Sequence, residues 1–491
     1  MATRTCTDHG GRLDAAVFAG LPKVASVVGP DHQSLDATYY DTADLRLARA
    51  GGTLRRTEGQ TWRATVPGGV DVSVPVARSP DRVPDELVDV VRAYTGGRPL
   101  RPCVHVTTHR DRWRLLGRSG GTLAEVADDA VHARVAGPRD KAATWRQVGI
   151  GPAAEQVEAG LRARLSRAGV PAAESGGANV LTKTLGVRRP AGSRPGHTST
   201  VGEAVTAYVR AQVAEVRAGD VAVHRGGRTA VHDMRVAVRR LRSTLRTFRK
   251  IVGRKRAGAV GVELKWLSDV LGDARDAEVL GRRLRAAIDE TPVDLVLGPV
   301  RAEVDRRLER GAADAHAALL AALADERYLS LLDTLDALVL DPNPHRTATR
   351  PARKVLPALV GKAYRRTSRA VGRAEEAGPG PGKDAALHSV RKATKRLRYA
   401  AEVAEPVIGA PAEHTRKRAK QVQSTLGDHH DLVVLRVALR DIGIHAHLAG
   451  SNAFTFGLLH GRAGERADQA ARDFERAWRK LSARRTTRWL G

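Results

Sequence analysis

The sequence predicts an α+β protein of two domains, with a strand-rich N-terminal part and an all-helical C-terminal part. Residues 1–186 contain short alternating or β-branched segments that Gly and Pro interrupt. From about residue 200, apolar residues recur with helical spacing. Two pairs of similar motifs lie 155 and 156 residues apart, which indicates that the helical part is duplicated. A chain of 491 residues is long enough for two or three domains with buried cores.

In the N-terminal part, residues 70–74 and 102–108 are predicted strands. Residues 153–169 are predicted to form a helix, because Val157, Leu161 and Leu165 recur every four residues. The following stretch, 187–199, is rich in Arg, Gly, Pro and Ser, a composition typical of a linker.

The helical part, 200–485, divides into two halves, each about the size of a four-helix bundle. The halves are roughly 200–340 and 350–485, and together they should hold about eight to ten helices. Clusters of Gly and Pro predict the breaks between helices near 252–261, 291–299, 341–351 and 378–383.

Positive charge is in large excess along this chain. The formal net charge is +28, of which the residues after 200 contribute +20. Such an excess predicts an acidic partner, which would be nucleic acid, an anionic membrane or polyphosphate. Arg greatly outnumbers Lys, and a guanidinium group binds phosphate oxygens in a bidentate fork.

Other features exclude several classes of protein. Cys6 and Cys103 are the only cysteines, which argues against a disulfide framework and a cysteine zinc site. We expect no membrane span, because the sequence has no run of about 18 apolar residues. The N-terminus lacks the basic start and apolar run of a signal peptide, so we expect a cytoplasmic protein.

The first matched pair of motifs places a histidine and three cations on one face of a helix in each half. The spacing is 0, 3, 7 and 10, which are positions on the same side of a helix. Like charges at this spacing repel one another, so two such stripes predict a polyanion bound between them. The stripes are His232, Arg235, Arg239 and Arg242 in the first half, and His388, Arg391, Lys395 and Arg398 in the second.

The second matched pair is a Leu-Gly-Asp-x-x-Asp motif that follows a lysine by six residues in each half. Lys265 and Lys420 are further candidate cations for the same site. The aspartates are candidate helix caps, general bases or partners that hold the stripe arginines, with caps and arginine partners favoured. These aspartates are Asp273 and Asp276 in the first half, and Asp428 and Asp431 in the second.

The two stripe histidines allow three interpretations. We favour imidazolium groups that bind phosphate, because both histidines head a stripe of cations. A metal ligand is less favoured, because no second His or Cys stands at ligand spacing on the same turn, and a structural role is the third reading. His429 and His430 stand side by side, but their match in the first half is Ala274 and Arg275, which suits phosphate contact better than metal binding. We therefore expect no metal site and no cofactor.

On these paired motifs, the stretch from about 200 to 485 resembles the CHAD family. The resemblance implies two four-helix bundles related by pseudo-twofold symmetry around a basic channel. It also implies binding of inorganic polyphosphate and association with polyphosphate granules. The eight stripe residues carry the family's basic positions, and Lys265 and Lys420 follow them.

Residues 1–186 resemble the CYTH family of triphosphate tunnel enzymes. The resemblance rests on residues 39–56, Trp62, the pair Arg110 and Arg112, Glu125 with Asp128, and Lys183. It implies an antiparallel β-tunnel with basic side chains that bind a triphosphate and carboxylates that hold a divalent metal. The candidate anion-binding residues in such a tunnel are Arg55, Arg63, Arg110, Arg112 and Lys183.

The chain departs from that family where metal would bind. Active members open with a Glu-x-Glu-x-Lys strand, whereas the first Glu here is Glu58. A second Glu-x-Glu is expected after Trp145, where the sequence instead holds Gly149, Gly151 and Pro152. Glu125 and Asp128/Asp129 alone are too few for a metal centre, so we expect a tunnel domain without catalytic activity.

These observations predict a polyphosphate-binding protein whose helical half carries the function. One alternative is a metal-dependent triphosphatase or polyphosphatase that acts through the N-terminal tunnel. A less favoured alternative is a nucleic-acid-binding protein, because aromatics for base stacking are scarce and no helix-turn-helix or zinc-finger pattern occurs. We expect nucleic acid to act only as a nonspecific competitor.

Overall fold

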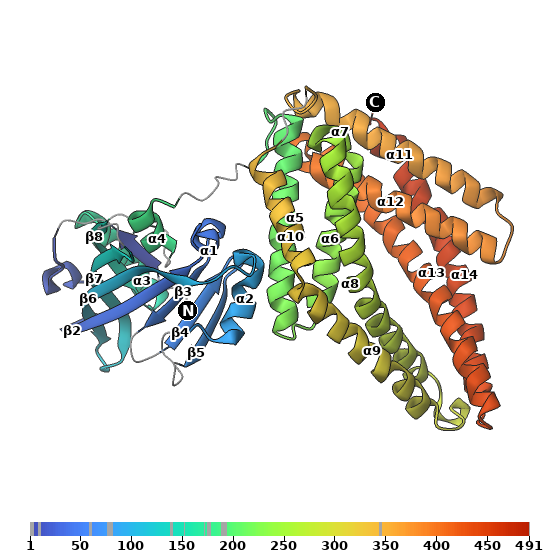
Figure 1. Cartoon of the computed structure of the whole chain (residues 1–491), viewed down its shortest axis with the longest axis horizontal. Helices are drawn as coiled ribbons and strands as arrows, with labels where there is room; N and C mark the ends of the chain where they lie inside the picture. The colour runs from blue at the N-terminus through green and yellow to red at the C-terminus, as the bar shows by residue number, and fades with distance from the viewer. Residues whose placement is uncertain are drawn as a thin grey trace. The chain divides into compact units, whose positions relative to one another are not determined.

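The computed structural model divides the chain into two compact units, Met1–Ala191 and Gly192–Gly491 (Figure 1). The boundary falls within the segment 187–199. The residues that the structure describes are 4–7, 11–57, 61–75, 82–137, 141–151, 153–170, 172–173, 178–187, 194–342 and 346–490.

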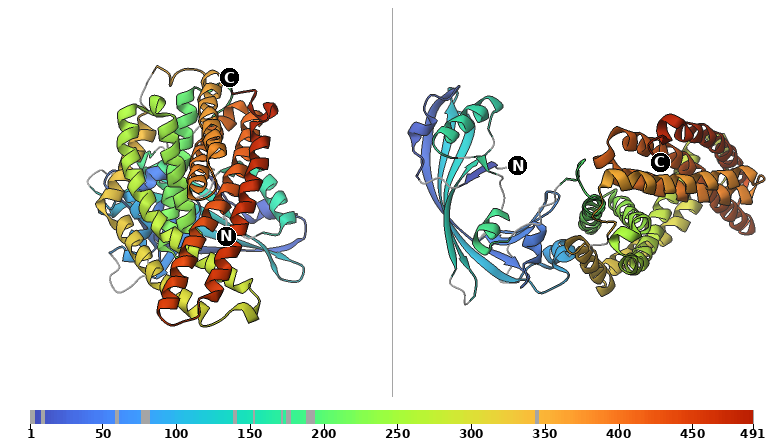
Figure 2. Two further views of the ribbon diagram at one scale, coloured as in Figure 1. Left: turned by 90° about the vertical axis from the view of Figure 1, so that its right-hand side faces the viewer. Right: turned by 90° about the horizontal axis from the view of Figure 1, so that it is seen from above.

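The first unit is built on one sheet of nine strands in the order β5-β4-β3-β2-β6-β7-β8-β1-β9. Every pairing is antiparallel. β5 and β9 stand at the two ends of this order, and the sheet curves strongly between them (Figure 2). The strands are β1 (Arg4–Thr7), β2 (Val24–Asp41), β3 (Thr53–Thr57), β4 (Thr61–Val66), β5 (Val70–Pro75), β6 (Arg101–Gly117), β7 (Thr122–Val135), β8 (Ala142–Ile150) and β9 (Ala172–Ala173).

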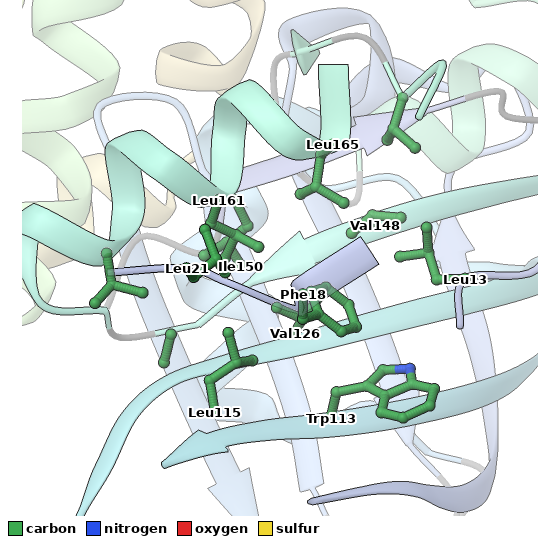
Figure 3. Close-up of a cluster of buried hydrophobic side chains, with 13 residues drawn as sticks. Leu13, Phe18, Leu21, Trp113, Leu115, Val126, Val148, Ile150, Leu161 and Leu165 are labelled. Carbon is green, nitrogen blue, oxygen red and sulfur yellow. The ribbon is translucent and has the colours of Figure 1, made fainter. Parts of the chain in front are cut away.

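One apolar cluster packs a helix onto this sheet (Figure 3). Trp113 and Leu115 alternate with exposed or half-buried residues along β6, so both point to the same face. Leu161 and Leu165 of α3 cover that face, which confirms the helix predicted from their spacing. The short helices of this unit are η1 (Ala15–Phe18), α1 (Arg46–Ala50), α2 (Asp85–Thr95), α3 (Glu155–Arg167) and α4 (Ala178–Leu185).

The second unit is helical throughout, which confirms the α+β class. Nine of its helices in the described part of the chain have 15 or more residues, and α7 and α15 have four each. They are α5 (Val201–His224), α6 (Ala230–Thr247), α7 (Arg249–Val252), α8 (Arg254–Asp289), α9 (Val300–Ala324), α10 (Glu326–Leu340), α11 (Ala352–Glu376), α12 (Pro381–Ile408), α13 (Ala410–Leu448), α14 (Phe454–Ser482) and α15 (Arg484–Thr487). A 3₁₀ helix, η2 (Val293–Leu295), lies between α8 and α9.

The helices form two halves that meet through equivalent helices. α5, α6, α8, α9 and α10 pack together in the first half, and α11 to α14 pack in succession in the second. α6 packs against α12, and α8 packs against α13. The far ends of α8, α9, α13 and α14 share one apolar cluster, which ties the halves together (Figure 1). The two stripes therefore lie on helices that contact one another.

Two sequence predictions about helix ends are wrong. The break expected over 252–261 is confined to Gly253, whose φ of 99° suits glycine, and α8 begins at the next residue. The paired Leu-Gly-Asp-x-x-Asp motifs lie in the middle of α8 and α13, so their aspartates are not helix caps. Both helices continue because neighbouring helices supply packing along their full length.

None of the helices in the described part of the chain has both the length and the apolar character that a membrane crossing requires.

Candidate anion-binding site

The two charged stripes converge where α6 packs against α12. Buried apolar residues, among them Met234 and Val238 on α6 and Val390 and Leu397 on α12, alternate with the cations along the two helices. The cations occupy the adjoining positions and are half-buried at the contact. We call four of them the central cluster, namely Arg235, Arg239, Arg391 and Lys395.

One hydrogen bond joins the halves within the central cluster. Arg239 Nε on α6 donates to the hydroxyl of Tyr399 on α12 at 2.8 Å. Tyr399 is buried, so this contact holds the Arg239 guanidinium in a fixed orientation. No local pattern in the sequence marks Tyr399 as part of this site, because the half-to-half contact that selects it joins distant residues.

The central cluster is electrostatically strained. Burial, followed by the charges of Arg239 and Arg391, lowers the pKa of Lys395 to about 6. Burial also lowers the pKa of Arg391, and Arg239 and Arg235 add to this effect. The arginines of α6 thus destabilise the charged forms of Arg391 and Lys395 on α12. An anion bound among them would remove this repulsion.

Few carboxylates oppose this charge. Asp276 of α8 accepts from Arg235 Nη1 at 2.6 Å, and its side chain is 71 % exposed. Asp431 of α13 pairs with Arg283 at 2.8 Å and lies close enough to act on the charge of Arg391. Asp276 therefore holds a stripe arginine, as one of the two favoured interpretations expected, whereas Asp428 and Asp431 pair with Arg283, which lies outside both stripes. Within the described ranges, Arg239, Arg391 and Lys395 form no ion pair.

The stripe histidines lie beside the cations, and the pKa of each is lowered. Burial and then His430 lower the pKa of His388 to about 4, and the two rings are 4.3 Å apart between centroids. Burial and then Arg275 lower the pKa of His232. Binding of phosphate by the imidazolium form stays a prediction, since a bound anion would raise both pKa values again. Among the described residues, no group of three His, Cys, Asp or Glu side chains could hold a metal ion.

The last cation of the second stripe does not join the central cluster. Arg398 donates from Nε to Glu402 at 2.9 Å and from Nη1 to Gln423 at 3.2 Å. Glu402 also forms an ion pair with Arg240 at 3.2 Å and accepts from the Tyr208 hydroxyl at 2.7 Å. We call this group the Glu402 centre. An internal carboxylate therefore neutralises Arg398, contrary to its predicted place in the shared site.

Three other predicted cations also lie apart from the four. Arg242 is half-buried on α6 and lies close enough to Arg396 of α12 to lower its pKa. Lys265 is exposed on α8 and forms an ion pair with Asp269 one turn later at 2.6 Å. Lys420 is exposed on α13. No contact of the described residues brings these three side chains into the central cluster.

In the first unit, acidic neighbours hold most of the predicted anion-binding residues. Arg110 on β6 faces Asp129 on β7 in register and forms a bidentate ion pair at 2.7 and 2.9 Å. Arg112 donates to both oxygens of Glu125 at 2.8 and 2.7 Å. Cross-strand ion pairs of this kind neutralise the positive charge of these arginines on the face of the sheet.

The remaining tunnel candidates have three different environments. Arg63 forms an ion pair with Asp71, and Arg55 is its half-buried neighbour across β3 and β4. The Lys183 ammonium lies 5.2 Å from the centre of the Trp145 ring, a cation–π contact.

The three carboxylates that the sequence offered to a metal are likewise held by arginines. Buried Asp128 accepts from Arg146 at 2.6 Å and from the Leu13 backbone N–H at 2.9 Å. Glu125 and Asp129 are held by Arg112 and Arg110. Each of the three carboxylates that the sequence offered to a metal thus has a guanidinium partner.

Comparison with known proteins identifies the helical unit. The family profile of the CHAD domain matches residues 207–440. Uncharacterized protein Rv2226 of Mycobacterium tuberculosis strain H37Rv is 36 % identical over 489 residues, which cover 94 % of this chain and 93 % of that protein. The structure of PptA from Streptomyces chartreusis is 25 % identical, covers 57 % of this chain and 100 % of its own, and has a TM-score of 0.48.

Proposed function

Because the chain belongs to the CHAD family, which is associated with polyphosphate, we propose that its helical unit binds inorganic polyphosphate through the central cluster. The observation that carries this proposal is the meeting of four cations from the two halves with a single ion pair, Arg235–Asp276, among the described residues. A site with this excess of positive charge is complementary to a chain of phosphoryl units.

The energetics favour a ligand with closely spaced negative charges. Lys395 and Arg391 are half-buried, so their unliganded state combines partial desolvation with mutual repulsion. A polyphosphate chain bound at the central cluster, on α6 and α12, would replace the repulsion among these cations with attraction to the phosphates. Binding driven in this way releases counterions and weakens steeply as salt increases.

Granule association follows from the length of the polymer. A long polyphosphate chain extends beyond one central cluster, so several protein molecules can bind one chain. We therefore propose that the protein acts in the cytoplasm and associates with polyphosphate granules. Nucleic acid competes only through its phosphate backbone, because the cluster offers cations and no stacking platform.

For the first unit we propose a role without catalysis. Glu125, Asp128 and Asp129 each satisfy an arginine, so a metal ion would have to break those pairs. The alternative is a metal-dependent triphosphatase, which needs several carboxylates converging on one ion. The pairing of these three carboxylates with guanidinium groups supports the non-catalytic role.

Direct binding of polyphosphate of defined length to the full chain tests the proposal. We expect labelled long-chain polyphosphate to bind at moderate salt, and unlabelled polyphosphate to displace DNA or RNA from the protein. If polyphosphate fails to displace nucleic acid under these conditions, the proposal is wrong and the protein binds nucleic acid.

A further inference from the structure

The Glu402 centre has a counterpart that lacks its carboxylate. The repeat relates the halves at an offset of 156 residues, as it relates His232 to His388. At this offset, Arg240 and Arg398 of the Glu402 centre correspond to Arg396 and Arg242, and Glu402 itself corresponds to Arg246. An arginine therefore stands where pseudo-twofold symmetry would place the acid.

The structure brings the corresponding residues together. Arg242 and Arg246 on α6, with Arg366 on α11, act on the charge of Arg396 on α12. α12 packs against both α6 and α11, so these three helices frame the group. Burial, followed by Arg246, Arg366 and then Arg242, lowers the pKa of Arg396 to about 10.

The Glu402 centre contains a carboxylate that neutralises its arginines, whereas its counterpart contains none among the described residues. At the Glu402 centre, the carboxylate lies 3.2 Å from Arg240 and 2.9 Å from Arg398 and accepts a phenol hydrogen bond. In the counterpart, within the described part of the chain, none of the four guanidinium groups has an ion pair or a side-chain hydrogen bond. Arg246 and Arg366 are exposed, so solutes reach the group from solvent.

We propose that Arg242, Arg246, Arg366 and Arg396 form an oxyanion site in which a phosphate group takes the place that a carboxylate holds at the Glu402 centre. Guanidinium forks match tetrahedral phosphate oxygens, and several forks around one group bind a multiply charged anion. The phosphate comes either from a small phosphate compound or from a polyphosphate chain, and the second source rests on the proposed function.

Exchange of one residue tests the site. Arg246→Glu introduces the missing carboxylate, and this side chain should pair with the remaining arginines in place of a bound phosphate. We expect it to weaken the binding of inorganic pyrophosphate to the full chain by tenfold or more, measured by titration calorimetry. We also expect the Tm of the unliganded protein to rise by about a few degrees, because three arginines gain a partner.

Two further variants separate the site from net charge and from folding. Arg249→Glu makes the same charge change just beyond the end of α6, at an exposed residue outside the group, and should leave pyrophosphate affinity within about twofold of wild type. Arg366→Gln alters an exposed side chain, so it should leave the fold intact and weaken pyrophosphate binding severalfold. Wild-type affinity in Arg246→Glu, or equal losses in Arg246→Glu and Arg249→Glu, would overturn the site.

The central cluster is tested separately. In a variant with Arg239→Ala and Lys395→Ala, pyrophosphate binding at the oxyanion site should survive while long-chain polyphosphate binding is lost. Loss of both ligands would show that pyrophosphate binds at the central cluster, and would overturn the oxyanion site. If Arg246→Glu weakens pyrophosphate and long-chain polyphosphate together, the polymer supplies the phosphate. If it weakens pyrophosphate alone, the ligand is a small phosphate compound.

Discussion

Arg239 of α6 donates a hydrogen bond of 2.8 Å from Nε to the hydroxyl of Tyr399 on α12, a residue 160 positions later in the chain. The phenol orients the guanidinium without cancelling its charge. Arg239 therefore keeps its full attraction for an anion while its direction is set by the opposite half. The two halves of the repeat thus depend on one another for the geometry of the central cluster.

Replacing Tyr399 by Phe should weaken polyphosphate binding by about two- to tenfold, the value of one hydrogen bond of about 0.5–1.5 kcal/mol. The change keeps the buried ring and removes the acceptor of Arg239. Fluorescence anisotropy with labelled polyphosphate measures the affinity, and a thermal melt checks the fold. An unchanged affinity would show that Arg239 does not need this orientation.

Replacing all four residues of the central cluster by Ala should weaken polyphosphate binding on the order of a thousandfold, at about 1 kcal/mol for each lost contact. The slope of log K against log salt should fall by about three to four, because fewer counterions are released. Affinity measured across a series of salt concentrations gives both quantities.

A matched control for this variant is available on α14. Arg472, Arg476, Arg479 and Lys480 are exposed, and replacing all four by Ala removes the same number of basic side chains. This control should keep most of the affinity and nearly all of the salt slope. Equal losses in the two variants would mean that net charge, and not the central cluster, holds the polymer.

Polyphosphate binding should take up protons. Lys395 has a pKa of about 6 in the unliganded protein, and a polyanion raises it toward the ordinary value of 10.5. Between these values the bound state holds a proton that the free state lacks, so affinity falls as pH rises. Titration calorimetry in two buffers of different ionisation enthalpy measures the uptake, and Lys395→Met should reduce it.

The same pKa shift acts on stability without ligand. The folded pKa of Lys395 lies below the unfolded value of 10.5, so between about pH 6 and 10.5 the unfolded chain binds the extra proton. Stability should therefore rise with pH across this window, and Lys395→Met should flatten the rise. Denaturant unfolding at several pH values tests the sign, and a stability that falls with pH in wild type and not in the variant would contradict it.

Glu402→Gln should lower the free energy of unfolding by about 3 kcal/mol, because it leaves the guanidinium groups of Arg240 and Arg398 without a countercharge in a mostly buried place. Glu405→Gln is the matched control. Glu405 holds Arg416 at a more exposed position, so its loss should cost less than about 1 kcal/mol. Denaturant unfolding measures the loss of free energy in both variants. Equal losses would argue against the Glu402 centre as a stabilising group.

The first unit should release no phosphate from tripolyphosphate in the presence of Mg²⁺ or Mn²⁺ above a protein-free control. Glu125, Asp128 and Asp129 each already form an ion pair with an arginine, which leaves no free carboxylate among them for a metal ion. A colorimetric phosphate assay measures the rate. Metal-dependent turnover that Glu125→Gln abolishes would establish the triphosphatase alternative instead.

Local sequence patterns predicted much of the fold. Helical spacing identified α3, α6 and α12, and the match between His232 and His388 identified the duplication. These features are readable because helix periodicity and repetition are properties of neighbouring residues. The breaks at α8 and the aspartate caps were mispredicted, because packing along a long helix overrode glycine and capping signals.

The sequence by itself determined the surplus of cations, their alignment on one helical face, and their occurrence in both halves. Only the tertiary structure decided which cations meet an acid. Arg235 meets Asp276 of another helix, Arg110 meets Asp129 of the next strand, and Arg239 meets a neutral phenol instead. The reason is physical: charges act through space, and the packing that sets their distances joins residues far apart in the chain, as with Arg239 and Tyr399, 160 positions apart.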